Sequence, residues 1–229
     1  EATGEISNSF GSFNTRKHTV KFSTGLMNDH FEIAGRLSNI ASDGYIDRAS
    51  SDLKSYFLQG SYVDDNTLIK AITFGGSEVT YQSWNGFDPD YIAALGENPN
   101  IDENRTFNTA GVFFDDNGAI QFYDREVDDY QQDHYQLHWN QRYNNNWSTN
   151  LGLNYTYGRG FFEQFREDDD FETYGFEPLI VNGETVNTTD LVRRRWLDND
   201  FYVLNASANY KDNNLDMIFG GSYSHYDGN

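Results

Sequence analysis

Apolar and polar side chains alternate, residue by residue, through several long segments of this chain. Tyr135, Leu137 and Trp139 occupy alternate positions, and the residues between them are histidine or glutamine. The same alternation recurs in three further segments, 31–37, 151–157 and 202–210. Because successive side chains of a β-strand point to opposite faces of the sheet, these segments predict strands with one apolar and one polar face.

Turn-forming Asn and Asp residues divide the chain into nine candidate strands. These are Glu5–Phe13, Lys17–Met27, Phe31–Ile40, Leu53–Val63, Leu68–Ser77, Tyr130–Tyr143, Trp147–Tyr157, Phe201–Tyr210 and Leu215–Tyr226. Aromatic residues make up 17% of the chain and there are only 3 prolines, which suits hydrogen-bonded strands and opposes disorder. We therefore expect an all-β, antiparallel, up-and-down fold.

Alternation alone fits either a soluble sandwich or a membrane barrel, in which the apolar face contacts lipid. Three features favour the barrel. Most of the strands are longer than the usual five or six residues and match a tilted bilayer crossing. Aromatic residues stand at several strand ends, as interfacial girdles do. Short and long connections alternate, as expected for short periplasmic turns and long external loops. With a mean hydropathy of −0.75 we expect no helical span.

Two long segments, about 78–129 and 158–200, are expected to be extracellular loops. They contain 12 acidic residues with 2 Arg and 11 acidic residues with 5 Arg, so together they hold 16 of the 20 net negative charges. This charge opposes binding to nucleic acid. Acidic loops can simply keep the surface soluble, or they can attract a cationic or metal-bearing ligand. Both interpretations stay open.

Nine strands are an odd number, whereas single-chain bacterial barrels have an even number. An open sheet edge cannot stay unpaired in lipid. We therefore expect residues 1–229 to form part of a larger β-barrel domain.

Several motifs resemble TonB-dependent outer-membrane receptors of the Bacteroidetes type. They occupy residues 11–15, 22–26, 42–56, 80–86, 129–137 and 193–199, in one order along the chain. The resemblance implies the first strands of a 22-stranded barrel in the outer membrane of a Gram-negative bacterium. It also implies a separate plug domain and a TonB complex as partners, neither represented in these residues. The implied activity is import of a scarce nutrient, most naturally a ferric siderophore or other iron complex, with cobalamin, haem, glycan or peptide as alternative substrates.

The first candidate ligand contacts are Tyr81 and Trp84, which follow a strand at its expected outer end and could stack on a planar or sugar-like ligand. They could equally belong to the interfacial girdle or pack within the loop. The other candidates are four consecutive residues, Arg193, Arg194, Arg195 and Trp196. Arginine forks bind carboxylate, catecholate or phosphate groups. The alternative is internal salt bridging to the acidic run 167–172.

That acidic run lacks the spacing of an EF-hand, so we expect a solvated segment rather than a Ca²⁺ site. His134 and His138 share one strand face and would point into a barrel lumen. Asp133 is adjacent to His134 and would point away from it, which opposes a catalytic pair of the omptin type. No catalytic motif is present, and we expect no enzyme activity, metal site or cofactor. An omptin-like hydrolase and an adhesive or scaffold barrel remain alternatives of another class.

Overall fold

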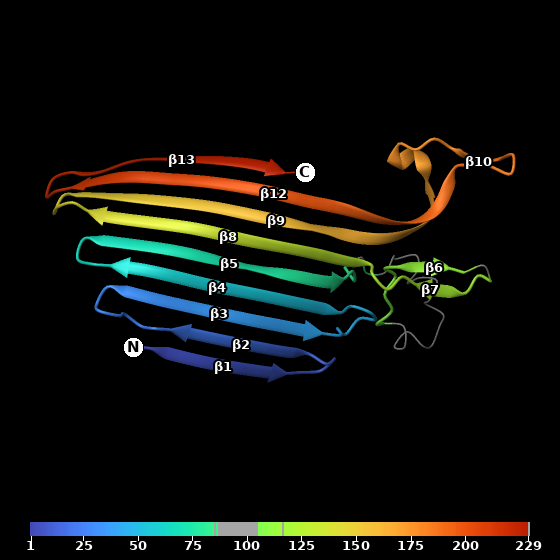
Figure 1. The fold of residues 1–229 in the computed structure, drawn as a ribbon, viewed down its shortest axis with the longest axis horizontal. Helices are drawn as coiled ribbons and strands as arrows, with labels where there is room; N and C mark the ends of the chain where they lie inside the picture. Colours follow the sequence, from blue (N-terminus) through green and yellow to red (C-terminus); the bar gives the residue numbers. More distant parts are fainter. Residues whose placement is uncertain (85, 87–104, 116, 229) are drawn as a thin grey trace.

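The computed structural model describes residues 1–84, 86, 105–115 and 117–228. Its main feature is one sheet in which each strand runs antiparallel to the next (Figure 1). In spatial order the strands are β1 (Thr3–Phe10), β2 (Arg16–Ser23), β3 (Phe31–Ser42), β4 (Ser51–Val63), β5 (Thr67–Tyr81), β8 (Val127–Arg142), β9 (Trp147–Asp170), β12 (Thr188–Lys211) and β13 (Asp216–Gly228). The predicted fold class, all-β with nine up-and-down strands, is confirmed.

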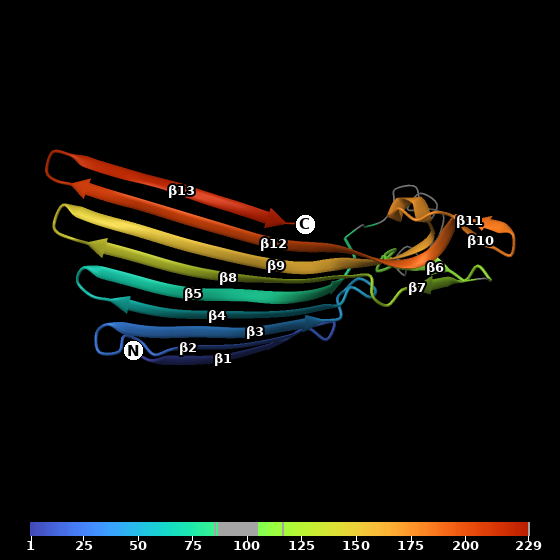
Figure 2. The same ribbon diagram turned by 45° about the horizontal axis from the view of Figure 1, so that its top comes forward.

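The remaining elements lie beyond one end of this sheet (Figures 1 and 2). β6 (Val112–Phe114) and β7 (Ile120–Phe122) form one small hairpin, and β10 (Leu179–Val181) and β11 (Glu184–Val186) form another. A single 3₁₀ turn, η1 (Phe171–Tyr174), precedes β10. Within the described residues, no helix is long and apolar enough to cross a membrane.

The two ends of the main sheet differ in their connections (Figure 1). At the end that we call the turn end, residues 24–30, 64–66, 143–146 and 212–215 join successive strands. At the other end, the loop end, the connections include residues 82–126 and 171–187. Despite these insertions, β5 pairs with β8 and β9 pairs with β12, so the strand order follows the chain order.

Three of the turns use the same side-chain device. Asp64, Asn144 and Asp212 each accept hydrogen bonds through Oδ1 from the backbone N–H groups two and three residues later, at 2.7 to 2.9 Å. Tyr62 and Tyr210 donate their hydroxyl protons to the aspartates at 2.9 Å. Short Asx-type turns of this kind close hairpins tightly, as the Asn and Asp clusters predicted.

The register aligns the alternating side chains across the sheet. Tyr135, Tyr155 and Tyr202 stand opposite one another on β8, β9 and β12, with ring centroids 5.9 and 4.8 Å apart. Leu137, Leu153 and Leu204 form the next row. We call this side the tyrosine face and the opposite side, which carries His134 and His138, the histidine face. The sheet forms a single layer in the described part of the chain, and these three leucines are 40–42% exposed.

The expected loop 158–200 requires a correction, because much of it is regular strand. β9 continues to Asp170 and β12 begins at Thr188, each 24 residues long. Charges do not end the ladder here because opposite charges face each other across it: Arg194 pairs with Glu163, and Arg159 with Asp198. The expected loop 78–129 is likewise shortened to 82–126.

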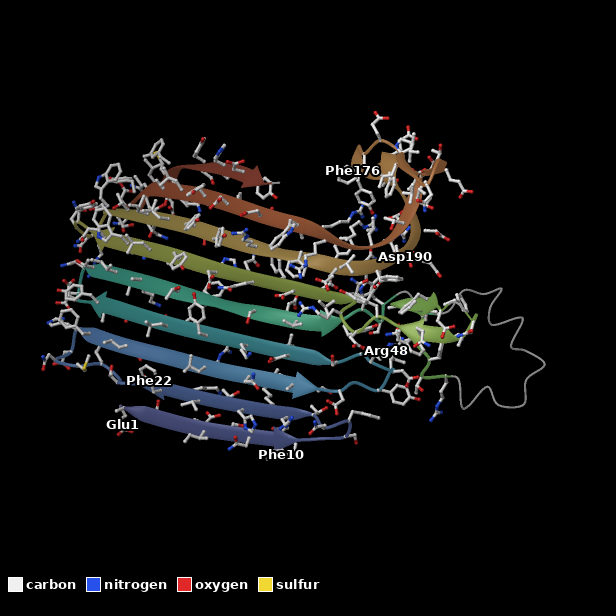
Figure 3. The ribbon with its side chains drawn as sticks, turned by 45° about the vertical axis from the view of Figure 1, so that its right-hand side comes forward. Glu1, Phe10, Phe22, Arg48, Phe176 and Asp190 are labelled. Carbon is white, nitrogen blue, oxygen red and sulfur yellow. The ribbon has the colours of Figure 1, made fainter. Side chains whose placement is uncertain are left out.

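Among the described residues, most buried side chains lie at the loop end, on the strand ends and in the connections, rather than in the middle of the sheet. They are Tyr81, Gln82, Asn108, Ala110, Glu126, Val127 and Glu163. Figure 3 shows Arg48, from the β3–β4 connection, at the base of the β6–β7 hairpin in the same region. The loops thus have a core of their own, anchored on the strand ends.

Candidate ligand-binding site at the loop end

A polar cluster at the loop end is centred on Glu163 of β9, whose side chain is 1% exposed. Arg194 of β12 donates from Nε to its Oε2 at 2.6 Å. Tyr123, just after β7, donates its hydroxyl proton to Oε1 at 2.5 Å, and Arg125 lies 3.4 Å from the same oxygen. One carboxylate thus joins the end of the 82–126 connection to two strands of the main sheet.

The electrostatics of this group follow from its surroundings. Burial alone would raise the pKa of Glu163, but the hydrogen bonds from Tyr123 and Arg194 and the two guanidinium charges outweigh it, so the pKa is lowered. Burial, followed by the hydrogen bond to the Glu163 carboxylate, raises the pKa of Tyr123 to about 12. Glu163 is therefore ionised and Tyr123 neutral at physiological pH. The cluster is a stable anchor and not a proton donor.

A second set of contacts satisfies backbone groups of β9 beyond the point where its pairing with β8 ends. The β8–β9 ladder ends at the pair Asp128 and Phe162. Beyond it, Glu126 accepts the backbone N–H of Phe165 at 3.0 Å. The Gln82 side chain donates to the Glu163 carbonyl at 3.4 Å, and the Gln82 N–H donates to the Glu126 carbonyl at 2.7 Å. Side chains of the connection thus replace the missing strand, as buried backbone groups require.

Tyr81, one of the predicted ligand contacts, is 6% exposed and belongs to this core. Its hydroxyl donates to the Tyr123 carbonyl at 2.6 Å and accepts from Arg48 Nε at 3.3 Å. Arg48 also donates to the Asn108 carbonyl and lies 3.8 Å above the Phe122 ring. In this conformation the Tyr81 ring holds the loop together and offers no open face for stacking.

Trp84, the other predicted aromatic contact, is 67% exposed. Its side chain hydrogen-bonds to Asp128, although burial has the larger effect on that carboxyl and raises its pKa. Asp128 stands opposite Phe162 on β9, and Phe162 stands opposite Arg195 on β12. The Arg195 guanidinium lies 5.5 Å from the Phe162 ring centroid. One row on the histidine face therefore brings together an exposed indole, a phenyl ring and an exposed guanidinium.

The predicted run of three arginines and a tryptophan does not form one cluster, because β12 is extended there and its side chains alternate. Arg194 and Trp196 belong to the tyrosine face, where Trp196 packs edge-on against Phe161 at 4.7 Å. Arg193 and Arg195 belong to the histidine face, and Arg193 donates to Gln164 Oε1 at 2.6 Å. The predicted alternative partners were the acids of 167–172, whereas the carboxylate that holds Arg194 is Glu163.

Sequence reasoning did not single out Phe162, Tyr130 or Glu163. Tyr130 lies on the histidine face of β8, and a Cβ on Gly158 or Gly160 would collide with it. The alternating glycines 158 and 160 beside an aromatic strand were a usable signal, since glycine in a strand marks a close approach. Nothing in the sequence pattern distinguishes Glu163 from the exposed acids that follow it.

His134 and His138 lie on the same face, as predicted. His134 stacks on Phe74 at 4.4 Å and shares a hydrogen bond of 2.9 Å between its Nδ1 and Thr156 Oγ1. Asp133 lies on the tyrosine face, where it accepts the hydroxyl proton of Tyr56 at 2.7 Å. The geometric objection to an Asp133–His134 pair is therefore confirmed. Among residues 1–84, 86, 105–115 and 117–228, no group of three or more His, Cys, Asp or Glu side chains is arranged to hold a metal ion.

No protein-family model matches the sequence, and no curated protein sequence matches it either. Solved structures do match. One is the crystal structure of the ferric-catecholate import receptor Fiu of Escherichia coli K12 in its closed form, with a TM-score of 0.67 and 10% sequence identity. The match covers 100% of this chain and 32% of that receptor. At this identity the likeness shows the fold, and the chain spans about a third of the protein that it resembles.

Proposed function

We propose that residues 1–229 form part of the barrel of an outer-membrane receptor that imports a ferric siderophore or another iron complex. The observation that carries the proposal is the nine-stranded sheet, aligned over its whole length with part of an import receptor. The proposed setting is the outer membrane of a Gram-negative bacterium, and the sequence motifs favour the Bacteroidetes type of TonB-dependent receptor. A plug domain and the TonB complex are the proposed protein partners.

The tyrosine face has the dimensions expected of a lipid-facing surface. Its apolar rows extend on β9 from Trp147, at the turn end, to Tyr155 and Tyr157. Ten residues separate Trp147 from Tyr157, and at ~3.3 Å per residue and a strand tilt of about 40° this gives a height of about 25 Å. That is close to the height of the apolar band of outer-membrane barrels, which aromatic residues flank at both interfaces. Outer-membrane lipid would cover this face, and the histidine face would line the interior.

In this proposed orientation the 82–126 connection and the outer parts of β9 and β12 would lie outside the cell. The row of Trp84, Phe162 and Arg195 would then lie on the inner side of the mouth. Aromatic rings beside a guanidinium suit a planar, anionic ligand, such as an iron complex with aromatic carboxylate or catecholate groups. Arg193 would add charge on the same side. Tyr81, Arg194 and Trp196 stay predicted contacts that would require rearrangement or access from the outer side.

The chemistry of this site is binding rather than catalysis. The carboxylate in its row, Asp128, hydrogen-bonds to Trp84, and the buried Glu163 on the opposite face is neutralised by two arginines. Its exposed groups are a guanidinium and aromatic rings, which orient a ligand but transfer no proton. We therefore expect a transport receptor and no enzyme activity.

Uptake by the complete protein in its own membrane tests the proposal. A deletion strain would be grown under iron limitation, and uptake of radiolabelled ferric complexes would be compared with cobalamin and haem. We expect loss of at least one iron complex in the deletion strain and its recovery on complementation. Equal uptake of every iron complex with and without the gene would refute iron import, and selective loss of cobalamin or haem would reassign the substrate.

An Arg195→Gln variant tests the site within the same strain. We expect at least about tenfold weaker binding of the anionic complex, since one charge-assisted hydrogen bond contributes about 1.5–3 kcal/mol. Arg16→Gln, near the loop end on the tyrosine face, is the matched control. Equal affinities for wild type and the Arg195 variant would remove this residue from the site.

A further inference from the structure

A second surface stands apart from the main sheet. Residues 167–190 form an arm that consists of the outermost residues of β9 and β12 and, between them, η1 and the β10–β11 hairpin (Figures 1 and 2). Phe176 and Asp190 mark it in Figure 3. We call residues 167–190 the arm.

The arm has a defined internal structure. Asp170 caps η1 by accepting the N–H of Glu172 at 2.9 Å, and Tyr174 donates its hydroxyl proton to Asp169 at 2.5 Å. The β10–β11 hairpin turns at Asn182 and Gly183, which both have positive φ, as a tight primed turn requires. The arm therefore presents its surface on a folded support.

The tip of the arm is apolar and exposed. Phe176 is 67% exposed, Leu179 55%, Ile180 77% and Val181 49%. In the described residues β10 pairs only with β11, so the backbone edges of this hairpin carry no further strand. Large side chains gathered in this way, on an open edge, mark an interaction surface.

The charge of the arm restricts what can bind there. Between Glu167 and Asp190 the sequence has eight acidic residues and no Lys or Arg. Like charges oppose a second copy of the arm, and the same repulsion opposes an anionic lipid surface. A hollow of about 460 Å³ includes Phe176 in its lining, together with Phe171 and the acidic residues Asp170, Glu172 and Glu177. Carboxylates and rings around one hollow complement a cationic side chain on an alkyl stem.

We infer that the arm is a docking surface for a basic, amphipathic polypeptide segment outside the cell. The segment adds as a strand to the open edge of the β10–β11 hairpin, since main-chain pairing supplies affinity and alternate side chains supply specificity. Because side chains alternate along β10, the apolar side chains of the segment cover Ile180 on one face, and the alkyl stems of its Lys or Arg side chains pass Leu179 and Val181 on the other. Its Lys or Arg side chains face the acidic base of the arm, and one of them enters the hollow.

Binding of a synthetic peptide to the complete protein tests this inference. The protein would be held in nanodiscs of zwitterionic lipid, and a 12-residue peptide of alternating Lys and Val would be titrated against it by biolayer interferometry, with empty nanodiscs as the reference. A peptide of alternating Glu and Val is the charge control. We expect binding of the Lys peptide alone, weakening by at least about tenfold between 50 and 300 mM salt.

Variants locate the binding site. Ile180→Asn removes an exposed apolar contact and should weaken the Lys peptide by about tenfold or more, since burying such a side chain contributes about 1.5–3 kcal/mol. Glu177→Gln should weaken it severalfold and reduce the salt dependence. Ile120→Asn is the matched control, because Ile120 is also exposed, at 50%, on the other small hairpin.

Each other result overturns the inference. Unchanged affinity of the Ile180 variant, an equal loss in the Ile120 variant, or equal binding of the Glu peptide would place the contact elsewhere. Concentration-dependent dimerisation in sedimentation velocity, abolished by Ile180→Asn, would identify a second copy as the occupant. None of these outcomes bears on iron uptake, so the inference can fail while the proposed function stands.

Discussion

Replacement of Glu163 by Gln should release the 82–126 connection from β9 and β12 without unfolding the sheet. The substitution keeps the size of a side chain that is 1% exposed. It removes the negative charge that holds Arg194 at 2.6 Å and Arg125 at 3.4 Å. One of the two carboxylate oxygens also becomes an amide group that cannot accept their protons.

The cost follows from these contacts. Loss of a buried hydrogen bond to a charged group destabilises the structure by about 1.5–3 kcal/mol. The arginine side chains are 47% and 55% exposed, so water can solvate them again, and the lower part of this range applies. A loss of about 2 kcal/mol raises the local opening equilibrium about 30-fold, because 1.4 kcal/mol corresponds to a factor of ten.

Hydrogen exchange of the complete protein measures that equilibrium. The amide protons of Gln82 and Phe165 are bonded to Glu126 and report on the same anchor. We expect their exchange to accelerate about 30-fold in Glu163→Gln and to remain unchanged in Glu167→Gln, an exposed acid of the same strand. Unchanged exchange at both amides would show that the carboxylate does not hold the connection, and the reasoning would be wrong.

Two further predictions concern the sheet and its turns. Leu153→Arg should destabilise the folded barrel by about 2–4 kcal/mol if the tyrosine face contacts lipid. Asn154→Arg, on the other face, should be tolerated. Urea unfolding in lipid vesicles measures both free energies, and equal losses would contradict the assigned orientation. Hydrogen bonds from following backbone amides, with a tyrosine hydroxyl, lower the pKa of Asp64 and Asp212. Their contribution is present above the unfolded value near 3.9 and is lost as the pH falls through the lower folded value. Amide exchange should therefore accelerate at these two turns below about pH 4. It should not accelerate at the equivalent turn of Asn144, because that side chain cannot titrate. Acceleration at all three turns would indicate general acid unfolding.

The sequence predicted the fold well because its strongest signal is also the strongest physical constraint. Alternation at Leu137 and Leu153 fixes which side chains share a face, and a slip of one residue would reverse every strand. Short turns then fix the register. The strand ends could not be predicted, because the charges of β9 and β12 resemble a loop until Arg194 is known to face Glu163.

The candidate site was predicted only in part. Trp84 and Arg195 do share one row of the histidine face. Their link, Phe162, lies between them in space and far from both in sequence. Tyr81, at the end of β5, was a predicted ligand contact but is buried. The connection that encloses it follows a path that no local sequence pattern specifies.

The unequal ends of the sheet have a consequence for how such a chain folds and varies. Four residues close the β8–β9 hairpin, whereas about 45 separate β5 from β8, yet the extra entropy of closing the longer loop is only about 2 kcal/mol. Hairpins should therefore form first at the short turns, and strand pairing should then extend towards the loop end. Insertions at the loop end then add little to the entropy cost of assembly, so the connections there can vary in length and sequence while the registered strands keep their pairing.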